Sequence, residues 1–417
     1  MDPGAQHYNM YVPHGGVPAP HTSSLLPSYP FDAATTLQVE LLDEGHLPPP
    51  ITSIAFDTAE ELLWCGTEDG WLTAMYAPTL ARHVSVEAHA HAIRQILPIG
   101  SGALSLCSSS VAFHTSSGVR TLTCGENDGE RSALRCMAYQ HPSGRIAGKL
   151  FVGRTTALVE SYDMTRGVLV KSAETNQGCE VMDWGTARSL LAIGGVEGEL
   201  SFRDVRNGLR QELVTSAHGS GAVTGLTCKG DLVVTCGLTK RAGQVVIDQF
   251  IKVFDVRYNA RLLNQLQCPT GPVSVAFNHG YESPTVSIVS ATGSVQTLDL
   301  MNPAVAPFNY QIDTHGATIL GQSVSSTGEL VAFNDDSGWV HMYCSNEDPY
   351  VNIESYSTAP VDEGILAQQA PFELPEDLLD CGLTAEEVNP AKVMYKSNSS
   401  LHGAKVIETK KKGLPDI

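Results

Sequence analysis

Charged side chains are scarce in this sequence, and positive ones are the scarcer of the two. Only 17% of the 417 residues are Asp, Glu, Lys or Arg, and 26 Lys and Arg stand against 45 Asp and Glu, for a formal net charge of -19. A field of that sign repels phosphate backbones. We therefore expect no strong direct nucleic-acid binding by this chain, although a local basic patch is compatible with the total.

The sequence also lacks the marks of secretion and of membrane insertion. Its first residues, MDPGAQHYNMYVPHGG, contain neither the basic stretch nor the apolar core of a signal peptide. No apolar run approaches the ~20 residues that cross a bilayer. The ten cysteines form no CxxC pair, and most lie in apolar runs such as LLWCG, so we interpret them as buried, reduced thiols. These features predict a cytoplasmic protein that does not contact membranes.

Catalytic and cofactor-binding motifs are absent as well. The sequence contains no P-loop, dinucleotide-binding, zinc-protease or nucleophile-elbow pattern. His89 and His91 superficially suggest a metal pair, but their place just before an apolar strand favours a structural hydrogen-bonding role. We expect no cofactor, no metal site and no enzymatic activity in this chain.

What the sequence does contain is a repeat of short apolar runs separated by Gly, Asp, Asn and Ser. Helical periodicity is almost absent from residues 36–350, which excludes helical solenoids and doubly wound folds. Similar opening strands begin 41 to 50 residues apart, at Ile51, Ile93, Leu134, Val181, Val223, Val273 and Ile319. WD-type blades repeat at about 40–45 residues, with four strands each. The pattern predicts an all-β fold, a seven-bladed WD-repeat-type β-propeller.

Two degenerate markers of the WD repeat support that prediction. An Asp ends the third strand of several units, at Asp163, Asp204, Asp255 and Asp299, in the place of the Trp-Asp dipeptide. His residues occupy the place of the Gly-His dipeptide, and acids lie in the turns between second and third strands. We expect hydrogen bonds within the blades from five such residues: Asp69, His91, His218, His315 and Asp336.

Two segments fall outside the repeat. The seventh unit has no outer strand of its own, so we expect TLQVELL, residues 36–42, to complete it as a clasp that joins both ends of the ring. The fifth unit carries an extra stretch, residues 240–250, which we interpret as a hairpin extension or loop on one face. It is either a binding element or a tolerated insertion.

Residues 1–35 and 351–417 do not follow the blade pattern. We interpret the first as a disordered segment and the second as an extended acidic linker. Residues 361–390 contain eight acidic residues and no Lys or Arg, and apolar side chains are interspersed. They favour partner binding, and the alternatives are a solvated linker or packing on the propeller itself. The candidate anchors are Phe372, Leu374, Leu378, Leu379, Val393, Met394 and Tyr395.

Particular stretches carry a resemblance to a known family. ITSIAFDTAEELLWCGTEDGWLTAMYAPTL, GGVEGELSFRDVRNG and the run from STGELVAFNDDSGWVHMY into FELPEDLLDCGLTAEEVNPAKVMY resemble the propeller and following linker of the catalytic subunit of the poly(A)-nuclease deadenylation complex. In that family an inactive ubiquitin-hydrolase-like domain and an exonuclease follow the linker. The family's catalytic acids have no counterpart in this sequence.

The resemblance implies a function as a scaffold. The linker and the propeller would bind the regulatory subunit, a homodimer with a pseudokinase-like domain, and the propeller would help to engage the poly(A) ribonucleoprotein indirectly. The alternative is a generic WD-repeat adaptor, such as a substrate receptor of a ubiquitin ligase.

Overall fold

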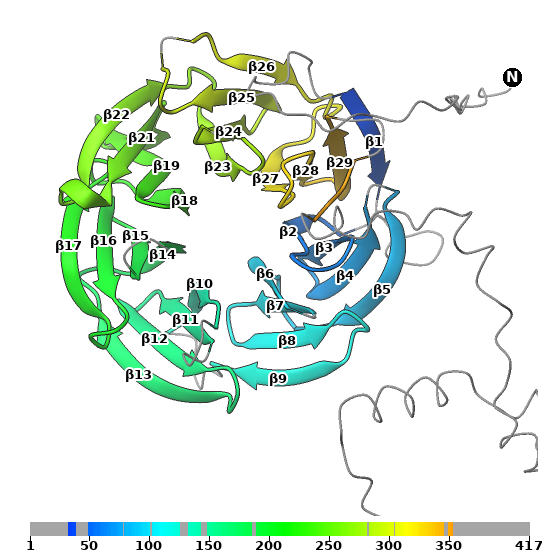
Figure 1. The fold of residues 1–417 in the computed structure, drawn as a ribbon, viewed down its shortest axis with the longest axis horizontal. Coiled ribbons are helices and arrows are strands. Elements are labelled where there is room, and N and C mark those ends of the chain that lie inside the picture. The colour runs from blue at the N-terminus through cyan, green and yellow to red at the C-terminus, as the bar shows by residue number, and fades with distance from the viewer. Residues whose placement is uncertain are drawn as a thin grey trace, which may run out of the picture. The chain divides into compact units, whose positions relative to one another are not determined.

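The structure, a computed structural model, forms a ring of seven antiparallel sheets (Figure 1). It describes the strand at 32–38 as backbone only, and residues 49–352 apart from 78, 101, 126–131, 143–147, 186–188, 282, 304 and 346–348. The ring confirms the seven-bladed propeller. In the described part of the chain the one helical element is a single 3-10 turn, η1 (Val256–Tyr258).

The first three blades are formed by consecutive strands, each paired with the next. Blade 1 has β2 (Ile51–Phe56), β3 (Leu62–Thr67), β4 (Trp71–Tyr76) and β5 (Ala81–Glu87). Blade 2 has β6 (Gln95–Ile99), β7 (Gly102–Leu106), β8 (Val111–Thr115) and β9 (Arg120–Cys124). Blade 3 has β10 (Leu134–Gln140), β11 (Lys149–Arg154), β12 (Leu158–Asp163) and β13 (Val168–Glu174).

The next three blades continue the pattern. Blade 4 has β14 (Cys179–Gly185), β15 (Leu190–Gly195), β16 (Glu199–Asp204) and β17 (Arg210–Ser216). Blade 5 has β18 (Val223–Lys229), β19 (Leu232–Arg241), β20 (Gln244–Ile247), β21 (Phe250–Asp255) and β22 (Arg261–Gln267). Blade 6 has β23 (Pro272–Asn278), β24 (Thr285–Ser290), β25 (Ser294–Asp299) and β26 (Phe308–Gln311).

Blade 7 is completed by a strand from the other end of the chain. It consists of β27 (Ile319–Val324), β28 (Leu330–Asp335) and β29 (Trp339–Cys344), and β1 (Asp32–Gln38) pairs antiparallel with β29 (Figure 1). The clasp is therefore confirmed, but its position is corrected. It runs from Asp32, four residues earlier than expected, so the segment interpreted as disordered does not extend to residue 35. Residues 39–42 of the expected clasp lie outside the described residues.

The core lies between the blades rather than within them. Seven clusters of buried apolar side chains each join two neighbouring sheets. One of them combines Ile51 and Leu63 of blade 1 with Ala332 and Met342 of blade 7. Of the cysteines, the nine described are all free, and most are buried, as expected. Because every sheet is covered on both faces by its neighbours, no blade is expected to be stable alone.

A ring of polar contacts joins the inner strands across the blade interfaces. Gln95 of blade 2 bonds both backbone groups of Met137 in blade 3, at 2.7 and 2.9 Å. Arg135 pairs with Glu180 of blade 4, and Asp183 accepts a bond of 2.7 Å from the backbone N–H of Cys228 in blade 5. Since each bond joins neighbouring blades, the contacts fix the register of the ring around its centre.

Candidate interaction surface

The described residues offer no obvious reaction centre. Among them, no group of three or more His, Cys, Asp or Glu side chains is placed to hold a metal ion. None of the described helices is long and apolar enough to cross a membrane. Polar networks hold several of the blade turns, and these turns present their other side chains to solvent.

Blade 5 contains a buried network around His218. His218 Nδ1 lies 2.9 Å from Asp248 Oδ2, and its Nε2 lies 3.1 Å from the hydroxyl oxygen of Thr235. Because a carboxylate can only accept hydrogen bonds, Nδ1 carries the proton and donates to Asp248, and Nε2 accepts a hydrogen bond from the Thr235 hydroxyl. Burial lowers the pKa of His218, and Asp248 opposes part of that shift. The imidazole is thus held neutral between Thr235 of β19 and Asp248, which lies in the link between β20 and β21.

Lys252 adds a charge to this network. Its Nζ lies 3.6 Å from Asp248 Oδ2 and donates to the backbone carbonyl of Ala217, which directly precedes His218. The close packing also requires glycine: a Cβ on Gly237 would lie 2.5 Å from the carbonyl oxygen of Ala222 and 2.9 Å from the His218 ring. The base of the β19–β20 hairpin is therefore tightly packed.

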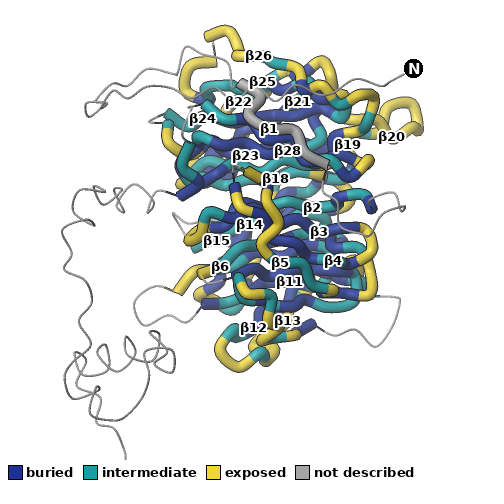
Figure 2. Tube along the Cα trace, turned by 90° about the vertical axis from the view of Figure 1, so that its right-hand side faces the viewer, coloured by how far each residue is buried: buried dark blue, intermediate teal, exposed yellow. Residues whose placement is uncertain are grey.

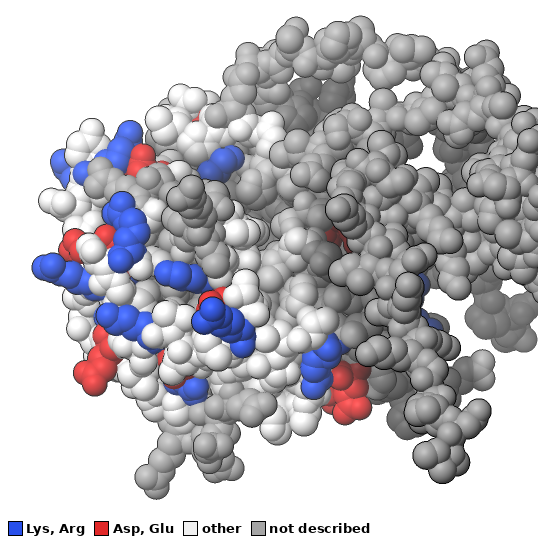
Figure 3. Space-filling view, turned by 60° about the horizontal axis from the view of Figure 1, so that its bottom comes forward, with Lys and Arg blue, Asp and Glu red and all other residues white. Residues whose placement is uncertain are grey.

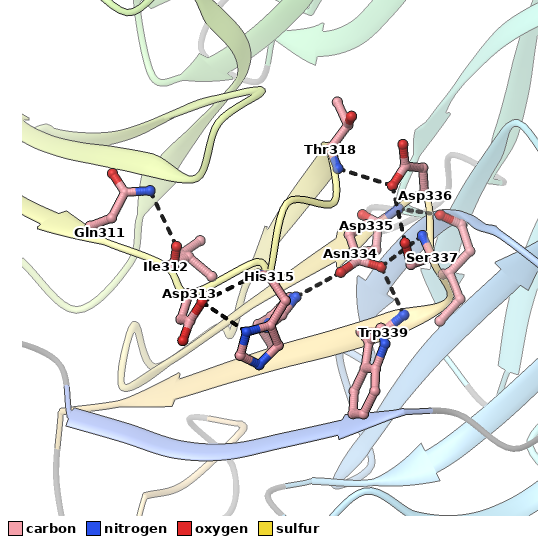
Figure 4. A network of polar contacts seen from close by, with 12 residues as sticks. Gln311, Ile312, Asp313, His315, Thr318, Asn334, Asp335, Asp336, Ser337 and Trp339 are labelled. Atoms are coloured by element: carbon pink, nitrogen blue, oxygen red, sulfur yellow. Dashed lines mark hydrogen bonds and ion pairs between the residues drawn. The ribbon is translucent and has the colours of Figure 1, made fainter.

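Blade 7 forms its network from different residues (Figure 4). Asp335 accepts backbone bonds from Ser337 and Trp339, at 3.0 and 2.9 Å, and its Oδ2 lies 2.9 Å from Nε2 of the buried His341. His315 lies outside this network, with a side chain that is 80% exposed and contacts Asp313. Asp336 is exposed and accepts a bond of 2.9 Å from the backbone N–H of Thr318.

The remaining two turn residues are exposed. His91 makes no hydrogen bond found among the described residues, whereas His89 is buried and lies 2.9 Å from the Ser105 hydroxyl oxygen. The structural His of this blade is thus His89 and not His91. Asp69 lies exposed in the turn between β3 and β4, and the described residues show no bond to its carboxylate. Of the five predicted residues, His218 is the one at the centre of a buried network.

The extra stretch of blade 5 is the β19–β20 hairpin. β19 extends beyond its pairing with β18 and pairs with β20, from Leu238↔Ile247 to Arg241↔Gln244. Ala242 and Gly243 form the turn with φ of 50° and 81°, the signs that a two-residue type I′ turn requires. The interpretation of a hairpin extension is confirmed.

The hairpin is a candidate interaction surface because its side chains lie in solvent. All four residues of β20 are exposed, including Val245, Val246 and Ile247 (Figure 2). Lys240 and Arg241 are exposed on the paired strand. Three adjacent β-branched residues on an edge strand are unusual without a partner, since such edges pair readily with other chains. The sequence located this insertion but did not show that its apolar residues point outward.

The candidate anchors of the C-terminal segment, Phe372, Leu374, Leu378, Leu379, Val393, Met394 and Tyr395, lie outside the described residues. The last described residues, Val351 and Asn352, are buried against blades 1 and 7. Asn352 donates a bond of 2.6 Å to the carbonyl oxygen of Glu60. These contacts hold the last two described residues on the ring.

Comparison with known proteins shows which family the propeller region resembles. The sequence profile described as PAN2 N-terminal matches residues 43–344. The catalytic subunit pan2 of the PAN2-PAN3 deadenylation complex from Aspergillus terreus is 32% identical over 305 residues, which are 72% of this chain and 25% of that protein. The Schizosaccharomyces pombe protein of the same name is 27% identical over 307 residues, 74% of this chain and 27% of that protein. The chain thus spans about a quarter of the length of these relatives.

A solved structure shows the same fold. The WD40 domain of Neurospora crassa Pan2 aligns with a TM-score of 0.66 and 22% sequence identity, over 77% of this chain and 98% of that one. At 22% identity this structural similarity supports a shared fold and nothing further.

Proposed function

This chain belongs to the PAN2 N-terminal family, and from that premise we propose that it is a non-catalytic scaffold region of a cytoplasmic deadenylation complex. Its curated relatives are named catalytic subunits of the PAN2-PAN3 complex, and this chain spans only about a quarter of their length. The proposed partner is accordingly PAN3, the regulatory subunit that the family resemblance describes as a homodimer with a pseudokinase-like domain. Through it, the chain would help to engage the poly(A) ribonucleoprotein.

The observation that carries the proposal is the exposed β19–β20 hairpin on a rigid ring. The His218 network and Gly237 hold its base, so binding there costs little ordering of the backbone. Val245, Val246 and Ile247 supply apolar surface, and Lys240 and Arg241 supply charge. We assign the propeller's contact with PAN3 to this hairpin.

The second proposed contact is the segment 353–417, because Val351 and Asn352 are themselves buried on the ring. Its apolar anchors stand in an acidic background, and such a segment binds with an ordering cost that several anchors must offset together. Aromatic anchors are expected to contribute most, which singles out Phe372 and Tyr395.

Titration calorimetry with purified PAN3 tests both contacts. We compare the intact chain, a truncation at Asn352, the double variant Phe372→Ala, Tyr395→Ala, and a hairpin variant with Val245, Val246 and Ile247 changed to Ser. Each is expected to weaken binding by tenfold or more, about 1.4 kcal/mol. The matched control is Val119→Ser, an equally exposed valine in blade 2, which is expected to bind like the intact chain.

The outcomes separate the proposals. Binding that survives the truncation removes residues 353–417 from the interface, and binding that survives the hairpin variant removes the hairpin. No heat of binding with the intact chain contradicts the PAN3 scaffold and favours the adaptor alternative.

A further inference from the structure

A second exposed apolar surface lies on β13, the outer strand of blade 3. The first three residues of this strand are largely exposed: Val168 by 50%, Leu169 by 50% and Val170 by 56%. β13 is the last strand of its sheet, and no described strand pairs with its outer edge. The chain therefore presents three adjacent aliphatic side chains at an open edge.

A β-bulge explains why three adjacent side chains point outward. The register of β12 and β13 passes from Ser161↔Lys171 to Tyr162↔Leu169, so Val170 has no partner on β12. Such a bulge adds one residue and breaks the alternation of faces. Blade 4 has the same bulge between β16 and β17, where Phe202 pairs with Leu213 and Arg203 with Gln211.

Blade 4 shows that the fold does not need apolar residues here. The residues that correspond to Val168, Leu169 and Val170 are Arg210, Gln211 and Glu212, all polar and exposed. Blades 3 and 4 thus have the same backbone conformation at this bulge, and of these two only blade 3 carries aliphatic side chains there. An exposed apolar patch that packing does not require is typical of an interaction site.

Basic side chains surround this patch. Arg166 precedes β13, and Lys171 follows the triplet. A Cβ added to Gly208 would lie 2.4 Å from Lys171 Nζ, so the ammonium group of Lys171 lies over the blade 4 turn that carries Arg206. Arg210 is next along that turn. Arg166, Lys171 and Arg210 are exposed, and no ion pair of theirs is found among the described residues.

The acids near the patch offset this charge only in part. Asp204 is buried and pairs with Arg206 at 3.1 Å, and Asp163 accepts bonds from Thr165 in its own turn. Glu212 is exposed on β17, and Glu174 is exposed at the far end of β13, three residues beyond Lys171. Figure 3, which brings the side of the ring with β9, β12 and β13 forward, shows Lys and Arg side chains spread over the described surface with acidic groups among them. In a chain of net charge -19, a surface of this kind selects negatively charged partners locally.

We propose that the blade 3 edge, formed by Val168, Leu169, Val170 and Lys171 with Arg166 and Arg210, binds an acidic polypeptide segment that carries apolar side chains. The aliphatic triplet contacts the apolar residues of the segment, and the three cations contact its carboxylates. A nucleic acid fits this surface less well, because base recognition on single strands uses aromatic platforms and these side chains are aliphatic. The proposal does not rest on the PAN3 assignment. The aliphatic triplet directly follows the turn between the third and fourth strands of blade 3, whereas the hairpin lies between the second and third paired strands of blade 5. Because the strands are antiparallel, these two kinds of turn lie on opposite faces of the ring.

Fluorescence anisotropy with a short synthetic peptide of alternating Glu and Leu tests the proposal. Two matched peptides, with Lys in place of Glu and with Ser in place of Leu, and a labelled oligoadenylate are titrated in parallel. We expect the Glu-Leu peptide to bind the intact chain, and the other three probes to bind at least about tenfold more weakly. Salt at about 0.5 M should weaken the binding further, since exposed charges are screened.

Two variants locate the site. Val168→Arg, Leu169→Gln, Val170→Glu installs the blade 4 residues on the same backbone and is expected to leave thermal stability unchanged while peptide binding falls about tenfold or more. The hairpin variant with Val245, Val246 and Ile247 changed to Ser is expected to bind the peptide normally. Equal binding by the triplet variant, preference for the Lys-Leu peptide or for oligoadenylate, or no binding by any probe would overturn the proposal.

Discussion

Blade 5 builds its sheet from one continuous stretch of chain and adds a hairpin, whereas blade 7 takes its outer strand from the other end of the chain. Both follow the same sequence pattern, with a His before the inner strand and an acid in a later turn. In blade 5 that His is fully buried between Asp248 and Thr235. In blade 7 it is His315, 80% exposed, and His341 takes the buried role. The same marker thus has a structural role only where the blade supplies buried partners for both ring nitrogens.

The largest expected effect comes from removing the strand that closes blade 7. Deleting residues 32–38 leaves the edge of β29 unpaired along six register pairs. We expect the midpoint of thermal unfolding to fall by about 10 °C, or the protein to aggregate, since each kcal/mol lost shifts the midpoint by about 2–4 °C in domains of this size class. Deleting residues 1–30 is the control and should leave the midpoint unchanged. Equal midpoints for the two truncations would contradict the clasp.

The comparison of the two His residues gives the next largest effect. His218→Ala leaves the buried Asp248 carboxylate and the Thr235 hydroxyl without the ring, which we expect to destabilise the fold by about 3 kcal/mol. His315→Ala is expected to change stability by less than about 0.5 kcal/mol, because its side chain is exposed. Denaturant titration followed by tryptophan fluorescence measures both. A similar loss of stability in the two variants would contradict the claim that burial gives His218 its structural role.

Acid is expected to destabilise the fold through its buried His residues. Burial and the positive charges of Arg120 and His89 lower the pKa of His114 to about 4, and burial lowers that of His218. In the unfolded chain these rings take up protons near pH 6.5, and in the folded chain only at lower pH. The unfolded state therefore binds more protons below pH 6.5, and stability falls as the pH falls.

One carboxyl group acts in the opposite direction. Burial raises the pKa of Asp183 to about 6, so its protonation stabilises the fold as the pH falls through that value. We expect the midpoint of thermal unfolding to be lower at pH 5 than at pH 7.5. The decrease in the midpoint should be smaller in His114→Gln and larger in Asp183→Asn. A midpoint that rises between pH 7.5 and pH 5 in the intact chain would contradict this account.

The smallest effect concerns the tip of the hairpin. Ala242 has a φ of 50°, a region that costs a non-glycine residue about 1–2 kcal/mol and that Asn tolerates better. Ala242→Asn creates the Asn-Gly pair preferred in type I′ turns and is expected to slow amide hydrogen exchange in residues 238–247 severalfold. Ala242→Val should speed exchange in the same residues. Equal exchange in both variants would mean that the turn does not limit the hairpin's stability.

The sequence predicted much of the fold because a propeller repeats one solution seven times. The opening strand of every blade was located near its observed position, and the insertion at 240–250 was recognised because it breaks the period. The start of the clasp was misplaced because DAATT has no large apolar residue and no alternation typical of a strand. Its place in the sheet depends on pairing with β29, a contact that no local pattern contains.

Side-chain roles were harder to predict. His89 and His91 are two residues apart, and only the backbone conformation decides which of them turns inward toward Ser105. His341 could not be singled out, because it lies on a strand where other blades carry different residues. The exposed triplet of β13 depends on a bulge, which shifts the alternation of faces by one residue and leaves no mark in the hydrophobic pattern.

Hydrogen-exchange mass spectrometry of the chain, with and without PAN3, tests the central claim most directly. The scaffold account predicts that PAN3 protects residues 238–247 of the blade 5 hairpin and part of residues 353–417. The shorter turn of blade 7 between β28 and β29 should remain unchanged. If PAN3 protects neither the hairpin nor the C-terminal segment, the chain does not bind it through these contacts and the account is contradicted.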